Sequence, residues 1–144
     1  MKTVEEVMEQ QFEVKGEDST VSSAVKVLAE KKERTLLIAS KTDILGIVTT
    51  TDIIYKVIAK DKDPKKTKLS EIMSSPVHAI GPGNTLQEAA ELMTKHKIKK
   101  LPVINEQGEI LGIITVSDII AEEPEEFNTL INLEVPVEKV KVGS

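Results

Sequence analysis

The stretch Ile44-Leu-Gly-Ile-Val-Thr-Thr-Thr-Asp-Ile-Ile54 recurs almost unchanged 66 residues later as Ile110-Leu-Gly-Ile-Ile-Thr-Val-Ser-Asp-Ile-Ile120. Two further pairs match at an offset of 65 residues: residues 4–8 with 69–73, and residues 19–28 with 84–93. Three matches in the same order indicate an internal duplication, which is the strongest signal for a repeat fold. The change of offset predicts one inserted residue in the second copy, around Asn105–Gly108.

Each copy shows the same change of periodicity along the chain. Thr20 and Thr85 are typical helix caps, and apolar residues follow them at i, i+3, i+4 and i+7 spacing, which predicts amphipathic helices. Short apolar runs bounded by turn residues predict strands. We expect strands at 12–14, 36–39 and 44–48 in the first copy and at 77–80, 101–104 and 110–114 in the second, with final helices over about 50–59 and 116–121.

The sequence therefore predicts an α/β (α+β) fold made of two β-α-β-β-α repeats. A three-stranded sheet with two helices is too small to form a core alone, so we expect the repeats to pack through their sheets with pseudo-twofold symmetry. The expected organisation is a first repeat over 1–60, a charged linker over 61–68, a second repeat over 69–121 and a tail over 122–144. In the tail, Pro124 ends the helix, and alternating apolar residues over 129–142 allow an extended segment.

Composition excludes several classes of function. The net charge of −5 and the 2% of aromatic residues argue against a nucleic-acid binder, since such proteins use basic patches and stacking rings. The chain has no cysteine, and neither His78 nor His96 has metal-ligand spacing. No catalytic motif is present, so we expect a protein that is not an enzyme. The sequence shows neither a signal peptide nor an apolar run long enough to span a bilayer. We therefore expect no membrane association and a cytoplasmic location.

The most informative motif is Gly46-Ile-Val-Thr49-Thr-Thr-Asp52, repeated as Gly112-Ile-Ile-Thr115-Val-Ser-Asp118. Together with the preceding strand Lys100-Leu-Pro-Val-Ile104, it resembles the motif that closes a CBS repeat. The resemblance covers residues 4–121 and identifies the chain as similar to a stand-alone tandem CBS pair, or Bateman module. It implies a regulatory module that binds AMP, ADP, ATP or S-adenosylmethionine between its repeats.

The Thr-x-x-Asp turns allow two interpretations. Asp52 and Asp118 could accept hydrogen bonds from a ribose diol, as the acidic residue of dinucleotide-binding folds does, while Thr49 and Thr115 and the free N–H groups bind sugar or phosphate. The same spacing is a capping box, in which the threonine and the carboxylate only stabilise the start of a helix. Both roles can coexist. The intervening Thr51 and Ser117 are included as candidate ligand residues.

Basic residues precede the middle strand of each copy. Arg34-Thr35 and Lys99-Lys100 occupy equivalent positions, which in the resembled family help to hold phosphates. Arginine and lysine provide charge-assisted hydrogen bonds to phosphate. The alternative is a solvated basic edge that prevents unwanted strand pairing. Arg34 is the more persuasive phosphate ligand, because a guanidinium suits bidentate contact.

By the same resemblance, base contacts would come from the first strand of one repeat and the middle strand of the other. Phe12-Glu13, Val77-His78 and Ile98 are the candidates. Glu33 replaces the apolar Ile98 in the first copy, so two unequal sites are expected. The site that combines Asp52 with Val77, His78 and Ile98 ranks first, ahead of the site that combines Asp118 with Phe12, Glu13 and Glu33.

The resulting expectation is a ligand-sensing regulatory module, with AMP as the first candidate ligand, ADP or ATP next and a role in energy sensing. The alternatives are a sensor of an S-adenosylmethionine-type ligand and a partner-binding scaffold with empty clefts. No cofactor is expected to be required. By resemblance, the chain forms a homodimer through its helices and acts on an unidentified effector protein.

Overall fold

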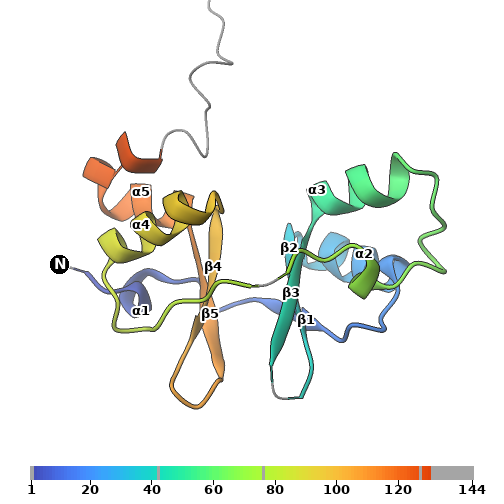
Figure 1. Cartoon of the computed structure of the whole chain (residues 1–144), viewed down its shortest axis with the longest axis horizontal. Coiled ribbons are helices and arrows are strands. Elements are labelled where there is room, and N and C mark those ends of the chain that lie inside the picture. The colour runs from blue at the N-terminus through green and yellow to red at the C-terminus, as the bar shows by residue number, and fades with distance from the viewer. Residues whose placement is uncertain (1, 42, 76, 127, 131–144) are drawn as a thin grey trace, which may run out of the picture. The chain divides into compact units, whose positions relative to one another are not determined.

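The amphipathic helices and both strand hairpins expected from the duplication are present in a computed structural model, which describes residues 2–41, 43–75, 77–126 and 128–130 (Figure 1). The chain divides into two compact units. The first unit is Phe12–Val77, and the second unit combines Met1–Gln11 with the residues from His78 onward. The expected packing of the repeats through their sheets stays a prediction.

The first unit contains a three-stranded sheet, with helix α2 between its first two strands in the chain and helix α3 after its last strand. Strand β1 runs parallel to β2, which is antiparallel to β3, so the order is β1-β2-β3. This is the expected β-α-β-β-α succession. The elements are β1 Glu13–Lys15, α2 Val21–Lys31, β2 Thr35–Ala39, β3 Ile44–Thr49, α3 Thr50–Ile53, a π-helical segment Ile54–Ile58 and a 3₁₀ turn Leu69–Glu71.

The second unit contains α1 Val4–Val7, α4 Leu86–His96, β4 Lys100–Ile104, β5 Ile110–Thr115, α5 Val116–Glu122 and a 3₁₀ turn Pro124–Glu126. The strand expected at 77–80 is wrong in extent. Only Ile80 pairs with β4, donating its N–H to the carbonyl of Pro102 and accepting from the N–H of Ile104. A parallel ladder continued back towards residue 77 would need an N–H from residue 102, and Pro102 has none to donate.

The long helices begin where the sequence predicts. Thr20 accepts from the N–H of Ser23 at 3.2 Å, and Thr85 forms a reciprocal capping box with Glu88. Both helices end on a lysine in the left-handed conformation, Lys32 with φ 57° and Lys97 with φ 55°. That position usually holds glycine, because a side chain there is strained. The two copies therefore share the start and also the strained end of this helix.

The extra residue of the second copy lies in the hairpin, as predicted. The first hairpin joins β2 and β3 through residues 40–43, and the second joins β4 and β5 through residues 105–109. The longer turn is built around Asn105, whose side-chain oxygen accepts from the N–H groups of Gln107 and Glu109. Gly108 takes a φ of 82°, which a glycine adopts without strain. The insertion is absorbed entirely by the turn.

The first segment of each sequence copy packs on the unit that contains the other copy's strands. Glu9 exchanges two backbone hydrogen bonds with Ile113 in the second unit, and Ser74 exchanges two with Ile47 in the first. Each of these two hydrogen-bonded segments lies directly against the glycine of a repeated motif, Gly112 or Gly46. A β-carbon at Gly112 would lie 2.5 Å from the carbonyl oxygen of Glu9, and one at Gly46 would lie 2.6 Å from the sulfur of Met73.

This exchange also closes the two hydrophobic cores. Val4 of α1 is fully buried in the core of the second unit, and Leu69 is fully buried in the core of the first. Each core is aliphatic and is completed by a segment distant in sequence. The first core comprises Val21, Ala24, Leu28, Leu36, Ile38, Val48, Ile53, Val57, Leu69 and Ile72, and the second Val4, Ile80, Leu86, Ala89, Ala90, Met93, Leu101, Val103, Ile114, Val116, Ile119 and Leu130.

The last helix differs between the copies. The helix expected over 50–59 changes after Ile53 to π-type hydrogen bonding, with the N–H of Ala59 donating to the carbonyl of Ile54. In the second unit α5 ends at Glu122, just before Pro124, as expected. The tail beyond Leu130, including most of the alternating run, lies outside the described residues. Within the described part of the chain, no helix combines the length and apolar character required to cross a bilayer.

Candidate functional site

The first Thr-x-x-Asp turn joins β3 to α3 in the first unit. Thr49 ends the strand, and its hydroxyl accepts from the N–H of Asp52 at 3.3 Å. In return, the Oδ2 atom of Asp52 accepts from the N–H of Thr49 at 2.9 Å and from its hydroxyl at 3.2 Å. This is a complete capping box, so the structural role anticipated for the motif is present.

The second turn repeats this geometry in the second unit. The N–H of Thr115 donates to Oδ2 of Asp118 at 3.0 Å, and the N–H of Asp118 donates to the hydroxyl of Thr115 at 3.1 Å. In both turns the threonine is extended and the aspartate lies in the first helical turn. The intervening Thr51 and Ser117 are exposed. Each unit thus presents a half-buried carboxylate and an exposed hydroxyl on the same turn.

The two carboxylates differ at their second oxygen. The Oδ1 atom of Asp52 lies 3.1 Å from Nζ of Lys56, which also donates to the carbonyl of Ile72 at 2.9 Å. Among the described residues, Oδ1 of Asp118 has no such partner. The residue equivalent to Lys56 is Glu122, and it pairs with Lys2 at 3.1 Å. Sequence reasoning missed Lys56, although its i+4 spacing from Asp52 is a recognisable ion-pair signal.

The basic residues lie beside these turns because of strand register. Thr35 pairs with Thr49 across β2 and β3, and the carbonyl of Arg34 accepts from the N–H of Thr50 at 3.0 Å. In the second unit Lys100 pairs with Thr115 across β4 and β5. There the carbonyl of Lys99 accepts from the N–H of Val116 at 3.0 Å, the equivalent bond. Each unit therefore brings one Thr-x-x-Asp turn next to its own candidate phosphate ligands.

Of the candidate base contacts in the first unit, Glu13 begins β1 and pairs with Leu36 of β2, and Phe12 directly precedes it. Glu33 is half-buried, and its N–H donates to the carbonyl of Leu28 just before β2. The expected grouping of Asp118 with Phe12, Glu13 and Glu33 takes residues from both units, and it stays a prediction.

The remaining base candidates fall at the boundary of the units and in the second. Ile98 packs against the hydrophobic core of the second unit, and Val77 is half-buried at the end of the first. The expected grouping of Asp52 with Val77, His78 and Ile98 also draws on both units and stays a prediction.

His78 has an unexpected neighbour in the second unit. Its ring stacks on that of His96, with centroids 3.6 Å apart and an angle of 15° between the planes. Loss of solvent contact lowers the pKa of His96 below its ordinary value, and the charges of His78 and Lys95 lower this pKa further. The contact could not be read from sequence, because the two residues meet only through the packing of the segment before α4.

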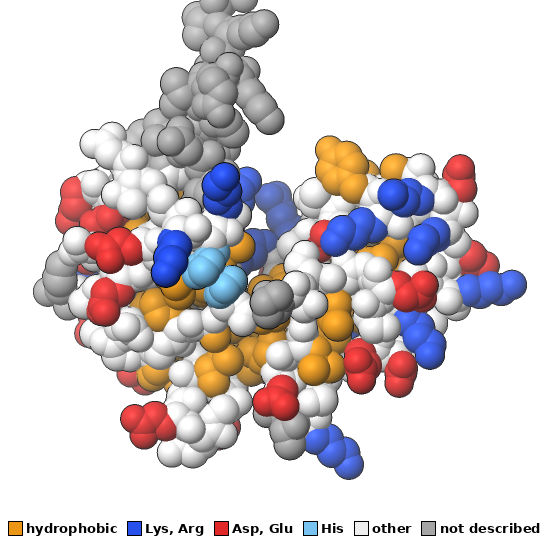
Figure 2. All heavy atoms as spheres, viewed as in Figure 1, with side chains coloured by type: hydrophobic (Ala, Val, Ile, Leu, Met, Phe, Trp, Pro, Cys, Tyr) orange, Lys and Arg blue, Asp and Glu red, His pale blue; other side chains and the backbone are white. Residues whose placement is uncertain are grey.

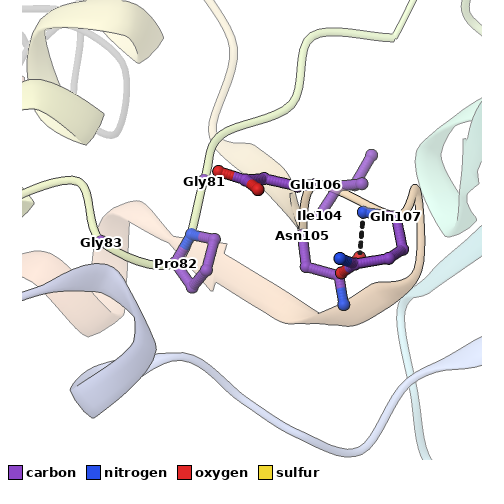
Figure 3. Close-up of a pocket in the computed structure, with 7 residues that line it drawn as sticks. All are labelled: Gly81, Pro82, Gly83, Ile104, Asn105, Glu106 and Gln107. Atoms are coloured by element: carbon purple, nitrogen blue, oxygen red, sulfur yellow. Dashed lines mark hydrogen bonds between the residues drawn. The ribbon is translucent and has the colours of Figure 1, made fainter.

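A hollow in the second unit lies away from these groups. Figure 3 shows it lined by the Gly81-Pro82-Gly83 loop and the β4–β5 turn. Its volume is about 610 Å³. Ile104 at its wall pairs with Ile110 near the turn, whereas Lys100 and Thr115 pair at the opposite end of the hairpin. It contains none of the candidate ligand residues. No cluster of three or more metal-binding side chains occurs among the residues that the structure describes.

Comparison with known proteins identifies the family. The profile of the CBS domain matches residues 4–59 and 69–125, which together form most of the chain. An uncharacterized protein of Methanopyrus kandleri is 30% identical over 110 residues. That match covers 74% of this chain and 56% of the relative, so the chain spans little more than half the relative's length.

Solved structures show the same fold. The hexameric CBS-CP12 protein from bloom-forming cyanobacteria superposes with a TM-score of 0.78 at 35% identity, covering 98% of this chain and 72% of that one. The CBS domain pair of protein MJ0100, in complex with 5′-methylthioadenosine and S-adenosyl-L-methionine, gives a TM-score of 0.74 at 23% identity, covering 87% and 98%. With two matched domains and a repeated fold, the chain belongs to the CBS domain family as a tandem CBS pair.

Proposed function

We propose that this CBS pair is a ligand-sensing regulatory module, without catalytic activity of its own, that binds adenosine nucleotides. AMP is the first candidate, with ADP and ATP next. The observation that carries the proposal is the duplicated turn, in which Asp52 and Asp118 each lie beside basic or hydroxyl residues at the start of the middle strand. A carboxylate beside hydroxyl and cationic groups matches the ribose and phosphate of a nucleotide.

A sensor of an S-adenosylmethionine-type ligand is the second candidate. The MJ0100 pair was solved with two adenosyl ligands that carry no phosphate, so a protein of this fold can hold them. The same aspartates would bind the ribose of either class of ligand. The two classes differ at Arg34, Lys99 and Lys100, because a nucleotide phosphate carries more negative charge for these cations than the single carboxylate of S-adenosylmethionine does.

A partner-binding scaffold without a small ligand is the third candidate. It is favoured by the capping boxes, since the backbone and hydroxyl contacts of Thr49 with Asp52 and of Thr115 with Asp118 would exist with no ligand present. On this reading the aspartates only stabilise the helix starts, a contribution of about 1 kcal/mol each.

Homodimerisation is part of the proposal and has a candidate surface. Ile54, Tyr55 and Ile58 of the π-helical segment are 55%, 66% and 58% exposed. Figure 2 shows hydrophobic side chains on the surface of the molecule in the region of α3. The equivalent Ile120 of the second unit packs against a core that includes Leu130. Large exposed apolar side chains mark interaction surfaces. We infer that they meet a second copy of the chain, and that the dimer acts on an effector protein.

Binding separates the three candidates. Isothermal titration of the whole chain with AMP, ATP and S-adenosylmethionine gives measurable heats for the ligand class that is bound, and thermal unfolding shifts upward with that ligand by mass action. We expect Asp118→Asn to weaken nucleotide binding at least tenfold, because the single oxygen of the amide either keeps the capping bond from Thr115 or faces the diol, and cannot do both. The matched control is Glu88→Gln, which alters a capping-box carboxylate on a helix without candidate ligand residues. Absence of binding by all three ligands at millimolar concentration leaves the scaffold as the function.

A further inference from the structure

The two ribose carboxylates are not equally available, and this inference rests on the proposed function. In the first unit both oxygens of Asp52 are engaged, Oδ2 by Thr49 and Oδ1 by Lys56. In the second unit only Oδ2 of Asp118 has a partner among the described residues. A ribose diol needs acceptor capacity on the carboxylate, so a ligand at Asp52 has to compete with an amine that is already bound there.

Lys56 is held in this position by a second contact. Its Nζ donates to the carbonyl of Ile72, a residue that is 2% exposed and belongs to the core of the first unit. The ammonium group is therefore anchored between a buried carbonyl and the carboxylate. The side chain of Asp52 is 16% exposed, so water screens the pair less than it would on an open surface. The contact is a fixed part of the turn.

The second unit replaces this lysine by an acid. Glu122 occupies the position equivalent to Lys56, and it is drawn to Lys2 of the N-terminal segment. Two like charges four residues apart on a helix repel each other, so the Glu122 carboxylate does not bind to Asp118 as the Lys56 ammonium binds to Asp52. The duplication therefore carries a charge reversal at one position, and that reversal decides which carboxylate keeps an open oxygen.

We propose that Lys56 occupies the Asp52 carboxylate as an internal competitor, so that the Asp118 turn takes an adenosine-type ligand first. The candidate base-contact residues favour the site at Asp52. The availability of a free carboxylate oxygen favours the site at Asp118 instead. An ion pair whose lysine side chain is 42% exposed contributes about 0–1 kcal/mol, so the competition weakens binding at Asp52 by up to about fivefold. Lys56 is thus a specificity-determining residue, because it makes ligand bind at the Asp118 turn at a lower concentration than at the Asp52 turn.

Single-site proteins test the order directly. Asp118→Asn leaves only the Asp52 turn, and Asp52→Asn leaves only the Asp118 turn. The probe is 5′-methylthioadenosine, because it has a ribose and no phosphate, and its dissociation constant is measured by isothermal titration. We expect the protein that keeps Asp118 to bind more tightly. Tighter binding by the protein that keeps Asp52 overturns the proposal.

The lysine itself is tested in the background that keeps only the Asp52 turn. Lys56→Met removes the ammonium group and keeps an aliphatic stem of similar length, and we expect binding to tighten two- to fivefold. Lys56→Gln replaces it if the methionine variant does not fold. In the background that keeps Asp118, Glu122→Lys should weaken binding to a similar extent. Unchanged or weaker binding by Lys56→Met overturns the proposal.

AMP serves as the second probe, because it carries a phosphate. It therefore distinguishes a Lys56 that competes with the ligand for Asp52 from a Lys56 that binds the phosphate of the ligand. If Lys56 binds a phosphate, Lys56→Met weakens AMP while 5′-methylthioadenosine is unaffected, and the competitor role is wrong. If the unmodified chain binds neither probe, the proposed function fails and this inference fails with it. If both bind and the order is reversed, only this inference fails.

Discussion

The carbonyl oxygen of Glu9 lies so close to Gly112 that a β-carbon on residue 112 would fall 2.5 Å from it. The N-terminal segment is held there by two hydrogen bonds, since the N–H of Glu9 donates to Ile113 at 2.8 Å and the N–H of Ile113 donates to Glu9 at 2.9 Å. The first glycine of the CBS motif is therefore required by a backbone crossing. Its role is to let a segment from the start of the chain lie flat on β5.

Gly112→Ala should destabilise the chain by about 2–3 kcal/mol. The Glu9 carbonyl cannot move away from the new methyl group without losing its hydrogen bonds to Ile113. Gly46→Ala should cost less, about 1–2 kcal/mol, because part of its obstacle is the thioether end of the Met73 side chain, which can rotate. Urea unfolding followed by circular dichroism measures both. Gly83→Ala is the control, since nothing lies within 4 Å of its β-carbon. Equal losses for all three variants would contradict this explanation.

Val4→Ala should destabilise the second unit although residue 4 belongs to the first sequence copy. Val4 is fully buried in the core of the second unit, and removing two methyl groups costs about 1.5–2.5 kcal/mol. Hydrogen exchange should then show faster amide exchange in α4 and β5 than in α2 and β3. Leu69→Ala is the matched variant, and it should reverse the pattern because Leu69 completes the core of the first unit.

Lys97→Gly should stabilise the chain by about 0.5–1 kcal/mol. Lys97 ends α4 with a φ of 55°, which glycine adopts without the strain that a side chain brings. The gain is measured as a higher midpoint of chemical unfolding, and Lys32→Gly should show it at the end of α2. Lys95→Gly is the control, because glycine inside the same helix costs about 1 kcal/mol. A loss of stability with Lys97→Gly would refute the predicted strain.

Acidification should weaken the fold through His96. Its pKa is lowered in the folded chain, first by desolvation and then by the charges of His78 and Lys95. The unfolded chain therefore binds this proton more readily, so stability is present above the ordinary pKa of 6.5 and is lost as the pH falls from there towards the lowered value.

The measurement is the melting temperature between pH 7.5 and 5. We expect His96→Gln to show a smaller decrease with acidification than the unmodified chain. Glu91→Gln on the same helix is the control, and it should keep the full decrease. If the histidine variant follows the unmodified chain at every pH, the stacked pair has no role in acid sensitivity.

The features that the sequence determined are those set by neighbouring residues. The caps at Thr20 and Thr85, the capping boxes of Thr49 and Thr115 and the extra residue in the second hairpin each depend on hydrogen bonds over five residues or fewer. Such bonds form wherever the residue types and their spacing are right. The duplication, the order of the elements and the position of the candidate ribose carboxylates could therefore be predicted from the sequence alone.

Tertiary structure decided what depends on distant segments. It placed Glu9 over Gly112, reduced the strand expected at 77–80 to a bridge at Ile80 and stacked His78 on His96. It also anchored Lys56 on the carbonyl of Ile72, which turned an ordinary i+4 ion pair into a fixed one. These contacts follow from which buried surfaces fit together, and two copies with the same local signals differ because their packing partners differ.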